Sequence, residues 1–350
     1  MAHIVRQSGN PDVWAVRSYR AGENSQIIGL AEALGAPFEE KRLVYKPTGA
    51  LGNLTRRVGL FGIDRRASSP LAPPWPKLII SAGLRNEPVC RWIAKQSEGR
   101  TRLVFLGRTW APRSEFDLIV TTPQYRLPDE DGVLHNLGTL HRVTEPRLVE
   151  AAEVWKAQLN PEDAPTIAVL IGGRSGPVTF GTHAANRLAS LAQARAEKIG
   201  AKLLVTSSSR TDPRAIDMLA AHLPKSAHVH RFGHGENPYF GVLALADEII
   251  VTSDSIAMLS EACATGKPVW IFDLGAPPRD KSLATELYRA LVRFGPKRLS
   301  RDLALVHESF IARDLAAWLE ADAKPASGGQ TQDVQRAVAY IRELLAASWL

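Results

Sequence analysis

The sequence is poor in cysteine and has no long apolar run. Cys90 and Cys263, the only cysteines among 350 residues, lie in apolar, helix-like stretches, so we expect no structural disulfide and a reducing, cytoplasmic setting. No stretch approaches the ~18 consecutive apolar residues that a membrane span needs. The N-terminal residues lack the apolar core of a secretory signal, so any membrane contact is expected to be peripheral, on the inner face of the cell membrane.

Motifs for metal and nucleic-acid binding are missing as well. The nine histidines are scattered, and the closest group, His228, His230 and His234, is expected to flank a strand and a loop. No RNA- or DNA-binding module can be recognised, so nucleic acid is not expected as a partner. We predict neither a metal site nor a bound cofactor.

The positive charge of the chain is concentrated in its first half. The net charge is +7, and residues 1–160 carry 22 Lys/Arg against 16 Asp/Glu, a net charge of +6. Within them, residues 41–66 interleave apolar side chains with seven basic residues and one acid, Asp64. Such a segment suits shallow docking on an anionic membrane surface; a solvated loop, or a buried helix with exposed arginines, is the alternative. The basic residues are Lys41, Arg42, Lys46, Arg56, Arg57, Arg65 and Arg66.

Short apolar runs alternate with helical stretches along the chain, which is typical of parallel α/β layering. Gly35 is expected to end the first helix. Repeated strand–loop–helix units indicate open, doubly wound, Rossmann-like sheets. The NPEDAP breaker divides the chain into domains 1–160 and 161–330, with the amphipathic helix 331–350 packing back on the first. The predicted strands, some of them given with the loop that follows, are 13–16, 77–83, 102–107, 116–122, 166–173, 201–209, 228–232, 248–255 and 267–274.

Three loops of the second half carry small polar residues where such sheets bind ligands, beyond the carboxyl ends of the strands. They are Gly172-Gly173-Arg174-Ser175, the stretch from Thr206 to Thr211, and Thr252-Ser253-Asp254-Ser255. Glycines, hydroxyls and helix N-termini suit a phosphate, and Glu261, six residues after Ser255, suits the hydroxyls of a ribose. Taken singly, these features also fit a tight turn, a helix N-cap or a surface helix residue.

Four segments together resemble the mitochondrial fission ELM family, whose bacterial members are GT-B glycosyltransferase-like proteins. The last segment is also similar to the donor-site region of GT-B glycosyltransferases and UDP-sugar 2-epimerases. The resemblance implies two Rossmann-like domains facing across a cleft, with the acceptor on the first and a nucleotide-sugar donor, as substrate, on the second. The segments are RAGENSQIIGLAEALG (20–35), VLIGGRSG (169–176), TSSSRTDP (206–213) and NPYFGVLALADEIIVTSDSIAMLSEACATGKPVWIF (237–272).

On the acceptor side, the resemblance implies Arg20, Gly22 and Gln26, with Glu23 as candidate general base. Where the family usually shows Asp-Gly-Lys/Arg-Ala-Gly-His/Asp, this chain has Ser18-Tyr19 in place of Asp-Gly and Glu23 in place of His or Asp. Glu23 equally fits an exposed residue of a first helical turn. For the donor site, the implied residues are Gly172, Gly173, Arg174, Ser175, Ser207, Ser209, Arg210, Asn237, Pro238, Ser253, Asp254, Ser255 and Glu261.

The leading hypothesis is a metal-independent glycosyltransferase that acts on a cell-envelope or lipid-linked acceptor, because helix N-termini and arginines can stabilise a leaving nucleoside diphosphate. One alternative is a non-catalytic adaptor on the same fold, since the resemblance includes a plant member that recruits a dynamin-like partner in organelle division. The other is a nucleotide-sugar epimerase or hydrolase. Nucleotide binding separates the enzymes from the adaptor.

Overall fold

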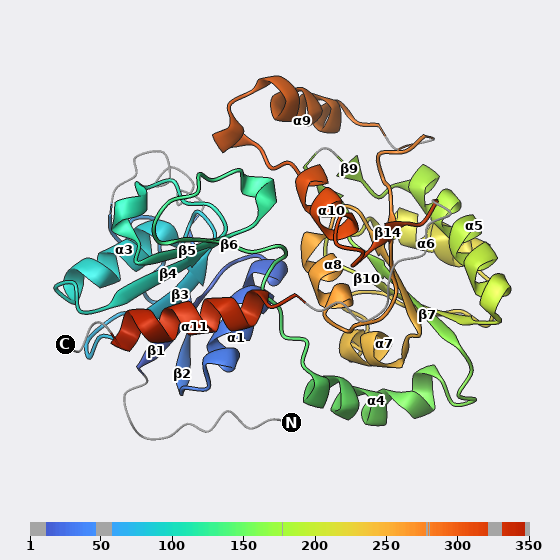
Figure 1. Ribbon diagram of the computed structural model, residues 1–350, viewed down its shortest axis with the longest axis horizontal. Helices are drawn as coiled ribbons and strands as arrows, with labels where there is room; N and C mark the ends of the chain where they lie inside the picture. The colour runs from blue at the N-terminus through green and yellow to red at the C-terminus, as the bar shows by residue number, and fades with distance from the viewer. Residues whose placement is uncertain are drawn as a thin grey trace. The chain divides into compact units, whose positions relative to one another are not determined.

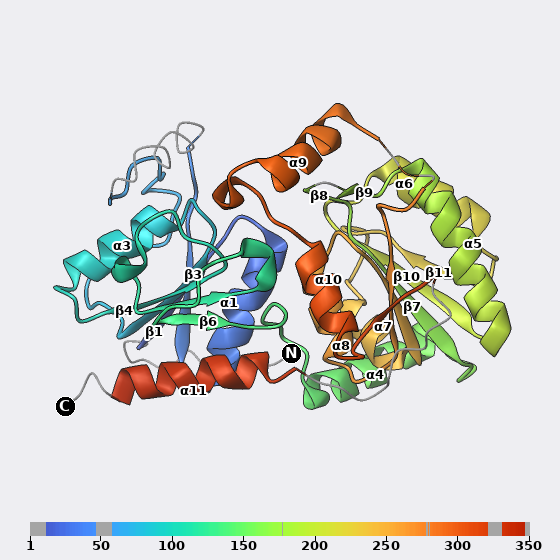
Figure 2. The same ribbon diagram turned by 45° about the horizontal axis from the view of Figure 1, so that its top comes forward.

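In the computed structural model, residues 12–46, 58–176, 178–277, 279, 281–320 and 331–346 are described. The chain forms two compact units, one of residues Met1–Arg142 with Gln332–Leu350 and the other of residues Val143–Thr331. Each unit contains a parallel sheet with helices packed on it (Figures 1 and 2). The predicted class, two Rossmann-like α/β domains, is confirmed; how the two face one another stays a prediction.

The sheet of the first unit has the strand order β2-β1-β3-β4-β5-β6, and all neighbouring strands are parallel. Its central strands are continuous apolar runs, as expected where helices cover both faces of a sheet. Because β2 and β3 lie on opposite sides of β1, strand addition reverses direction between β1 and β3. The strands are β1 (Val13–Arg17), β2 (Phe38–Arg42), β3 (Leu78–Ala82), β4 (Arg102–Leu106), β5 (Leu118–Thr121) and β6 (Val133–His135).

Helices α1 (Ala21–Leu34) and α11 (Asp333–Ala346) cover one face of this sheet, and α3 (Glu87–Gln96) covers the other. Gly35, in the left-handed conformation at φ 73°, ends α1 as predicted. The Asp333 carboxylate accepts hydrogen bonds from the backbone N–H groups of Leu137 and Gly138, at 3.0 and 2.8 Å. These bonds fix the C-terminal helix to the first unit.

The sheet of the second unit has the order β11-β10-β7-β12-β13-β14, again with all neighbours parallel. Strands β8 (Arg174–Ser175) and β9 (Val178–Thr179) form a separate antiparallel pair. From β7 the chain continues to β10 on one side and later to β12 on the other, which is the Rossmann order. The strands are β7 (Thr166–Ile171), β10 (Lys202–Ser207), β11 (His228–His230), β12 (Glu248–Thr252), β13 (Val269–Phe272) and β14 (Ala317–Trp318).

Helices α5 and α6 share an apolar core with one face of this sheet, while α7 and α8 contact its central strands. Asp212 caps α6 through the backbone N–H of Arg214, and Gly200, at φ 66°, ends α5. Cys90 and Cys263 are free and buried, one in each unit. The helices are α4 (Glu145–Leu159), α5 (Thr182–Ile199), α6 (Pro213–His222), α7 (Tyr239–Leu245), α8 (Ile256–Cys263), α9 (Leu283–Phe294) and α10 (Ala304–Ile311).

Helix α4 belongs to the second unit, whereas the NPEDAP pattern places the boundary after it, at residue 160. The packing of α4 on α7 explains the difference, because Gly241 of α7 lies directly against the Trp155 side chain of α4. A Cβ atom at Gly241 would come within 2.5 Å of Trp155 Cγ, so glycine permits the close approach of the two helices. The boundary therefore falls after Arg142, before the helix.

We expect Gly241→Ala to destabilise the second unit, although alanine is favoured over glycine in helices by about 1 kcal/mol. The added methyl group overlaps the Trp155 side chain, and overpacking of this kind costs about 1–3 kcal/mol. Thermal unfolding followed by circular dichroism should give a lower melting temperature than the wild type. A melting temperature equal to or above that of the wild type would contradict the tight contact of α4 with α7.

Candidate functional site

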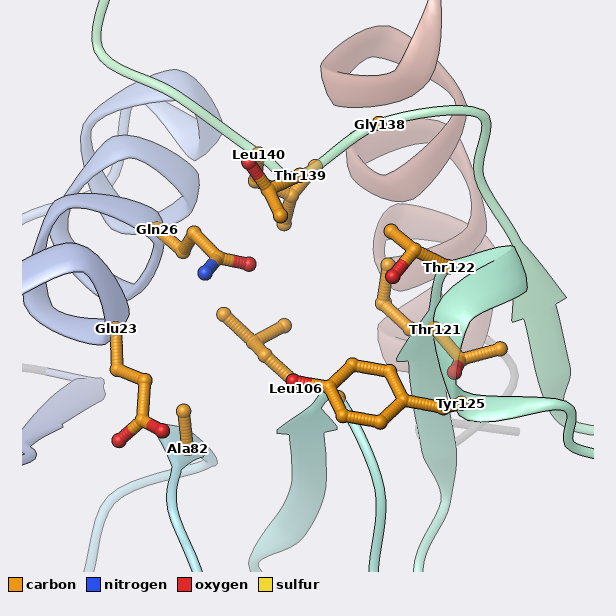
Figure 3. Close-up of a pocket in the computed structure, with 12 residues that line it drawn as sticks. Glu23, Gln26, Ala82, Leu106, Thr121, Thr122, Tyr125, Gly138, Thr139 and Leu140 are labelled. Atoms are coloured by element: carbon orange, nitrogen blue, oxygen red, sulfur yellow. The ribbon is translucent and has the colours of Figure 1, made fainter. Parts of the chain in front are cut away.

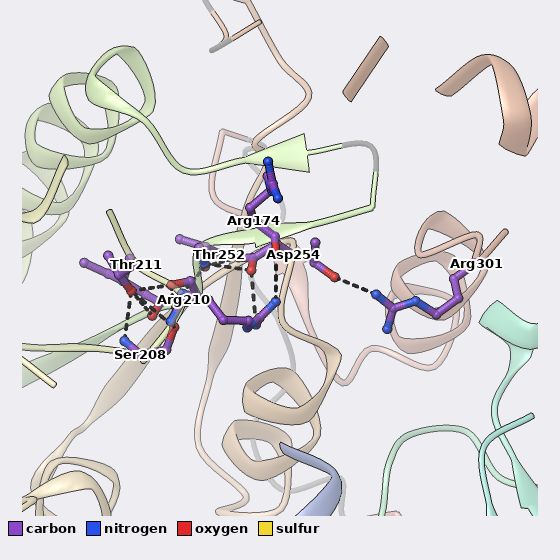
Figure 4. Close-up of polar contacts among 11 residues, drawn as sticks. Arg174, Ser208, Arg210, Thr211, Thr252, Asp254 and Arg301 are labelled. Atoms are coloured by element: carbon purple, nitrogen blue, oxygen red, sulfur yellow. Dashed lines mark hydrogen bonds and ion pairs between the residues drawn. The ribbon is translucent and has the colours of Figure 1, made fainter. Parts of the chain in front are cut away.

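Three loops meet at the carboxyl edge of the second sheet. The order of strands reverses direction between β7 and β12, and open α/β sheets bind ligands beyond the strand ends at this switch point. We call residues 172–175, 208–211 and 252–255, at the ends of β7, β10 and β12, the three-loop cluster. Hydrogen bonds join the three loops, so the structure brings together the segments that the sequence analysis singled out (Figure 4).

The carboxylate of Asp254 lies at the centre of the three-loop cluster and is completely buried. It accepts hydrogen bonds from the backbone N–H of Gly173 and from the hydroxyl of Thr252, both at 2.8 Å. The Arg210 guanidinium lies 3.3 Å from the same carboxylate. Burial raises the pKa of Asp254, and the positive charge of Arg210 opposes this shift.

Hydrogen bonds around Gly172 connect the other members of the cluster. The N–H of Gly172 donates to the Thr252 hydroxyl at 2.8 Å, while its carbonyl accepts bonds from the Ser208 and Thr211 hydroxyls. Arg210 Nη1 also donates to the Arg174 carbonyl at 3.1 Å. The loops after β7, β10 and β12 are therefore held as one structure.

Glycine is required at both positions of the first loop because the three loops approach closely. A Cβ atom at Gly172 would overlap the Asp254 carboxylate, and one at Gly173 would overlap the Arg210 backbone carbonyl. The N–H groups of both glycines donate to acceptors within the protein. The contact of these N–H groups with donor phosphates, implied by the family resemblance, stays a prediction, and this geometry explains the glycines without it.

Two arginines supply the positive charge at the surface of the cluster. Arg174 is exposed, and Arg210 is 43% exposed while contacting the buried Asp254. Figure 4 shows the Arg174 side chain turned away from Asp254. An anion at the strand ends would therefore meet arginine side chains rather than the glycine N–H groups.

The serines proposed for the donor site differ in their surroundings. The Ser175 hydroxyl accepts a hydrogen bond from Arg301 Nη2 at 3.0 Å. The Ser207 hydroxyl accepts one from the N–H of Phe232 at 2.9 Å. The Ser253 hydroxyl accepts one from the N–H of Leu274 at 3.1 Å. These three support neighbouring loops. Ser209 is exposed, and Ser255 is the N-cap residue of α8 without a capping side-chain hydrogen bond.

Glu261 on α8 is buried and accepts a hydrogen bond from the Tyr239 hydroxyl at 2.6 Å. Burial beside this carboxylate raises the pKa of Tyr239. Asn237 Oδ1 accepts from the N–H of Tyr239 at 3.2 Å, and Pro238 is the N-cap residue of α7. Tyr239 thus joins Glu261 to Asn237 and Pro238, the residues proposed for the nucleotide side. Sequence analysis missed Tyr239, although it stands inside the quoted segment NPYF.

Helix α10 places a buried histidine, His307, next to the end of β12. Burial lowers the pKa of His307 from 6.5 to about 4, and a hydrogen bond with the backbone of Ser253 opposes this shift. The His307 ring lies edge-on to Trp318, with the ring centroids 5.5 Å apart. His307 is therefore uncharged near neutral pH, and its hydrogen bond with the backbone of Ser253 stabilises the loop after β12.

Glu23 occupies the switch point of the first sheet, between the ends of β1 and β3. Its carboxylate accepts a hydrogen bond from the Ser18 hydroxyl and lies 3.4 Å from Arg20 Nη1. Glycine is favoured at position 83, after β3, because the backbone there has φ 85°; a Cβ atom would also come within 2.6 Å of Glu23 Oε2. Sequence analysis treated Ser18 only as a departure from the family pattern, yet its hydroxyl orients Glu23.

Glu23 lines a small pocket, with a cavity volume of about 20 Å³, at the carboxyl ends of β3, β4 and β5. The Gln26 amide reaches into this pocket from α1, opposite the ring of Tyr125 (Figure 3). Thr121 lines it with a buried hydroxyl that makes no hydrogen bond within the described protein. Of the other predicted acceptor-side residues, Arg20 contacts Glu23, and the Gly22 carbonyl accepts from the Gln26 amide at 3.2 Å.

The basic segment 41–66 is described only in part, because residues 47–57 lie outside the described ranges. Lys41 is not on an exposed basic surface: it is 5% exposed, lies 4.0 Å from the Trp14 ring centroid and pairs with Glu39 at 2.7 Å. Phe61 is exposed, whereas Ile63 is buried. The described part of the segment therefore contains both buried and exposed side chains.

His228, His230 and His234 line an open groove with Trp155 and Gln158. Burial lowers the pKa of His228 and of His230. Within the described ranges, no three His, Cys, Asp or Glu side chains are arranged to hold a metal ion. None of the described helices combines the length and hydropathy needed to cross a bilayer.

Two parallel Rossmann-like sheets, the second with a polar loop cluster at its switch point, define an α/β protein of the nucleotide-binding class of folds. The chain belongs to the mitochondrial fission ELM1 family, whose sequence model matches residues 21–343. It is 31% identical to the mitochondrial fission protein ELM1 of Arabidopsis thaliana over 233 residues, covering 60% of this chain and 54% of the plant protein. The chain thus spans about half the length of that relative.

Further comparisons give weaker likenesses. The chain is 23% identical over 312 residues to the uncharacterized protein RP120 of Rickettsia prowazekii, covering 79% of this chain and 86% of that protein. The UDP-GlcNAc 2-epimerase of Neisseria meningitidis, solved with UDP-GlcNAc, matches with a TM-score of 0.49 and 15% identity, over 96% and 99% of the two chains. The ADP-heptose LPS heptosyltransferase II of E. coli matches with a TM-score of 0.45 and 11% identity, over 97% of this chain and 99% of that chain.

Substitution of His307 should change the pH dependence of stability. Above pH 6.5 the imidazole is neutral in both the folded and unfolded chains; between 6.5 and about 4 only the unfolded chain takes up the proton. Folding stability is therefore lost as pH falls, by up to about 1.4 kcal/mol per pH unit. In His307→Gln this contribution is absent, so urea unfolding should show a shallower loss toward acid pH. A difference between the two proteins that is constant with pH would contradict the assignment.

Proposed function

We propose that this protein is a glycosyltransferase that takes its sugar from a nucleotide-sugar donor bound at the three-loop cluster. Its substrate is a nucleotide sugar rather than a resident cofactor, and arginines rather than a metal ion neutralise the leaving diphosphate. The observation that carries the proposal is the convergence of three loops at the switch point of the second sheet, with two arginines at its surface. Preorganised positive charge at this position stabilises charge that develops on a leaving group.

The donor would extend from the three-loop cluster along α8. At about 1.5 Å per helical residue, Glu261 lies about 9 Å beyond Ser255, roughly the span from a diphosphate to a ribose. A carboxylate can accept hydrogen bonds from both ribose hydroxyls. Tyr239 donates to one oxygen of Glu261 and so orients the carboxylate. Asn237 and Pro238 precede Tyr239 and are proposed to line the base.

The pocket of the first unit, which has room for about one small polar group, is proposed to take the attacking hydroxyl of the acceptor. Its polar lining combines one carboxylate, Glu23, with an amide and several hydroxyls, which suits a neutral, hydroxyl-bearing group better than an anion. The buried Thr121 hydroxyl has no hydrogen-bond partner among the described residues, and a bound hydroxyl group would supply one. Glu23, oriented by Ser18, is proposed to accept the proton of the attacking hydroxyl.

The acceptor class is proposed as a cell-envelope or lipid-linked glycan. For such an acceptor we propose a location in the cytoplasm, peripheral to the inner face of the cell membrane, with residues 41–66 as a proposed contact with that surface. The name of the Arabidopsis relative favours a second candidate, a non-catalytic adaptor in organelle division. An epimerase is the third candidate, because it shares the requirement for a nucleotide sugar.

Nucleotide binding tests the donor site. We expect one of UDP, GDP, CDP, ADP or CMP to raise the melting temperature, since a ligand at a hundredfold excess over its Kd stabilises the folded state by about 2.7 kcal/mol. In Glu261→Gln, calorimetry should show binding weakened about tenfold or more, because hydrogen bonds to a charged group contribute about 1.5–3 kcal/mol.

The exposed Glu308 on α10 is a matched control in the same unit, and Glu308→Gln should bind the nucleotide as the wild type does. A chain that no nucleotide stabilises would favour the adaptor. Inversion of the sugar without an acceptor would favour the epimerase.

Glu23→Gln tests the acceptor side. With the nucleotide sugar that stabilises the chain and a cell-envelope lipid extract, the rate of sugar transfer should fall about 10²- to 10⁴-fold, the usual contribution of a general base. Ser18→Ala should lower the rate less, because it only removes the hydrogen bond that orients the carboxylate. Nucleotide affinity should be unchanged in both variants. An undiminished transfer rate in Glu23→Gln would remove Glu23 from the mechanism.

A further inference from the structure

Helix α9 of the second unit turns apolar side chains outward. Thr285 is its only buried residue, while Leu283, Leu287 and Phe294 are 79%, 63% and 78% exposed. Four of the ten large apolar side chains that are exposed in the described ranges fall between Leu283 and Leu299. Both ribbon views draw α9 at the margin of its unit, apart from the sheet (Figures 1 and 2). Such clustering marks an interaction site.

The outward side chains form a single stripe. Leu283, Leu287, Ala290 and Phe294 follow at intervals of four, three and four residues, which places them on one face of a helix. We call these four residues the α9 stripe. All four are exposed, so the apolar face of this helix does not contribute to the core of the unit.

The opposite face of α9 contacts the rest of the unit through Tyr288, and the start of the helix is closed by its own capping box. Ser282 and Thr285 form a capping box at its start, with the Ser282 hydroxyl accepting from the Thr285 N–H at 3.2 Å. The Tyr288 hydroxyl accepts from the N–H of Arg301 at 2.8 Å, and its ring lies against Gly176. The helix is therefore fixed with the α9 stripe outward, opposite to the usual orientation of a surface helix.

The segment around α9 is strongly basic. Residues 279–301 contain seven Lys/Arg and two Asp/Glu, which gives a net charge of +5. Residues 161–350 as a whole contain 21 Lys/Arg and 20 Asp/Glu, which gives a net charge of +1. The remainder of that half therefore carries −4. Arg293, Lys297 and Arg298 are exposed at the C-terminal end of α9 and just after it. Positive charge beside an outward apolar stripe complements an anionic, partly apolar surface.

We propose that the α9 stripe and its flanking basic residues dock the protein on the surface of an anionic lipid bilayer. An interfacial helix places its apolar face about 5–10 Å into the boundary of headgroups and acyl chains, with Lys and Arg in the headgroup layer. A second copy of the chain would bring the same charge of +5 to the contact, and this repulsion opposes self-association through α9. The proposal does not depend on the glycosyltransferase reaction.

Vesicle binding by the full chain tests the docking surface. The chain should co-sediment with vesicles of phosphatidylcholine mixed with phosphatidylglycerol, and far less with phosphatidylcholine alone. Raising the ionic strength to about 1 M, where the Debye length is about 3 Å, should reduce the binding. Arg293→Gln should lower the partition constant about fivefold, the effect of one basic residue near an anionic surface.

Two exposed helical residues of the second unit give a matched pair of apolar substitutions. Leu287→Glu on the α9 stripe should lower the partition constant about tenfold or more, because it loses a buried side chain and adds a repelled carboxylate. Val154→Glu on α4, where Val154 is 62% exposed, adds the same charge away from α9 and should bind as the wild type does. Circular dichroism melts should confirm that both variants are folded.

Three outcomes would overturn the proposal. The first is no binding of the wild type to the anionic vesicles. The second is an equal loss of binding in Leu287→Glu and Val154→Glu. The third is dimerisation in sedimentation velocity that Leu287→Glu abolishes while vesicle binding is retained, since the α9 stripe would then be an interface between copies.

Discussion

The buried carboxylate of Asp254 is the constraint on which the loop edge of the second unit depends. A charge removed from water must be met by hydrogen-bond donors or an opposite charge. Here the loop after β7 provides a backbone N–H, β12 a hydroxyl, and the loop after β10 an arginine. Gly172 and Gly173 follow from the same constraint, because a Cβ atom at either position would overlap the neighbouring loops. The loops therefore act as one rigid support that holds their arginines beyond the strand ends.

The first unit repeats this arrangement with a different outcome. There, too, a glycine after a central strand lies against a carboxylate, Gly83 against Glu23 in the first turn of α1. Glu23, however, is 20% exposed, accepts from the Ser18 hydroxyl and from the exposed Arg20, and lines a small pocket, whereas Asp254 is fully buried among its donors. A carboxylate that is fully buried among protein donors supports structure, while one that is partly exposed and faces a pocket can still be reached by a ligand. Asp254 therefore has a structural role, whereas Glu23 faces a pocket, which is why it is the residue proposed as the base.

The central strands and the convergence of the loops could be predicted from the sequence, because strands buried on both faces are continuous apolar runs and parallel strands share a carboxyl edge. Strand β2, Phe38–Arg42, was missed because four of its five residues are charged and give no apolar run. Lys41 is buried there through its contacts with Trp14 and Glu39. The partners of the site carboxylates were missed for a similar reason. The bond from Tyr239 to Glu261 joins residues 22 positions apart and depends on side-chain conformations that no local pattern encodes.

Helix α9 shows where a periodic pattern is insufficient. The spacing of Leu283, Leu287 and Phe294 gives an apolar face whether that face points inward or outward, so only the packing of Thr285 and Tyr288 decides its direction. An apolar surface left uncovered promotes aggregation unless charge opposes it. The basic residues of 279–301 provide that opposition between copies and at the same time attract an anionic surface. On the docking proposal, one segment would therefore oppose contact between copies and favour contact with an anionic membrane. On such a surface a lipid-linked acceptor would already be concentrated, so the need for a strongly apolar acceptor pocket is reduced.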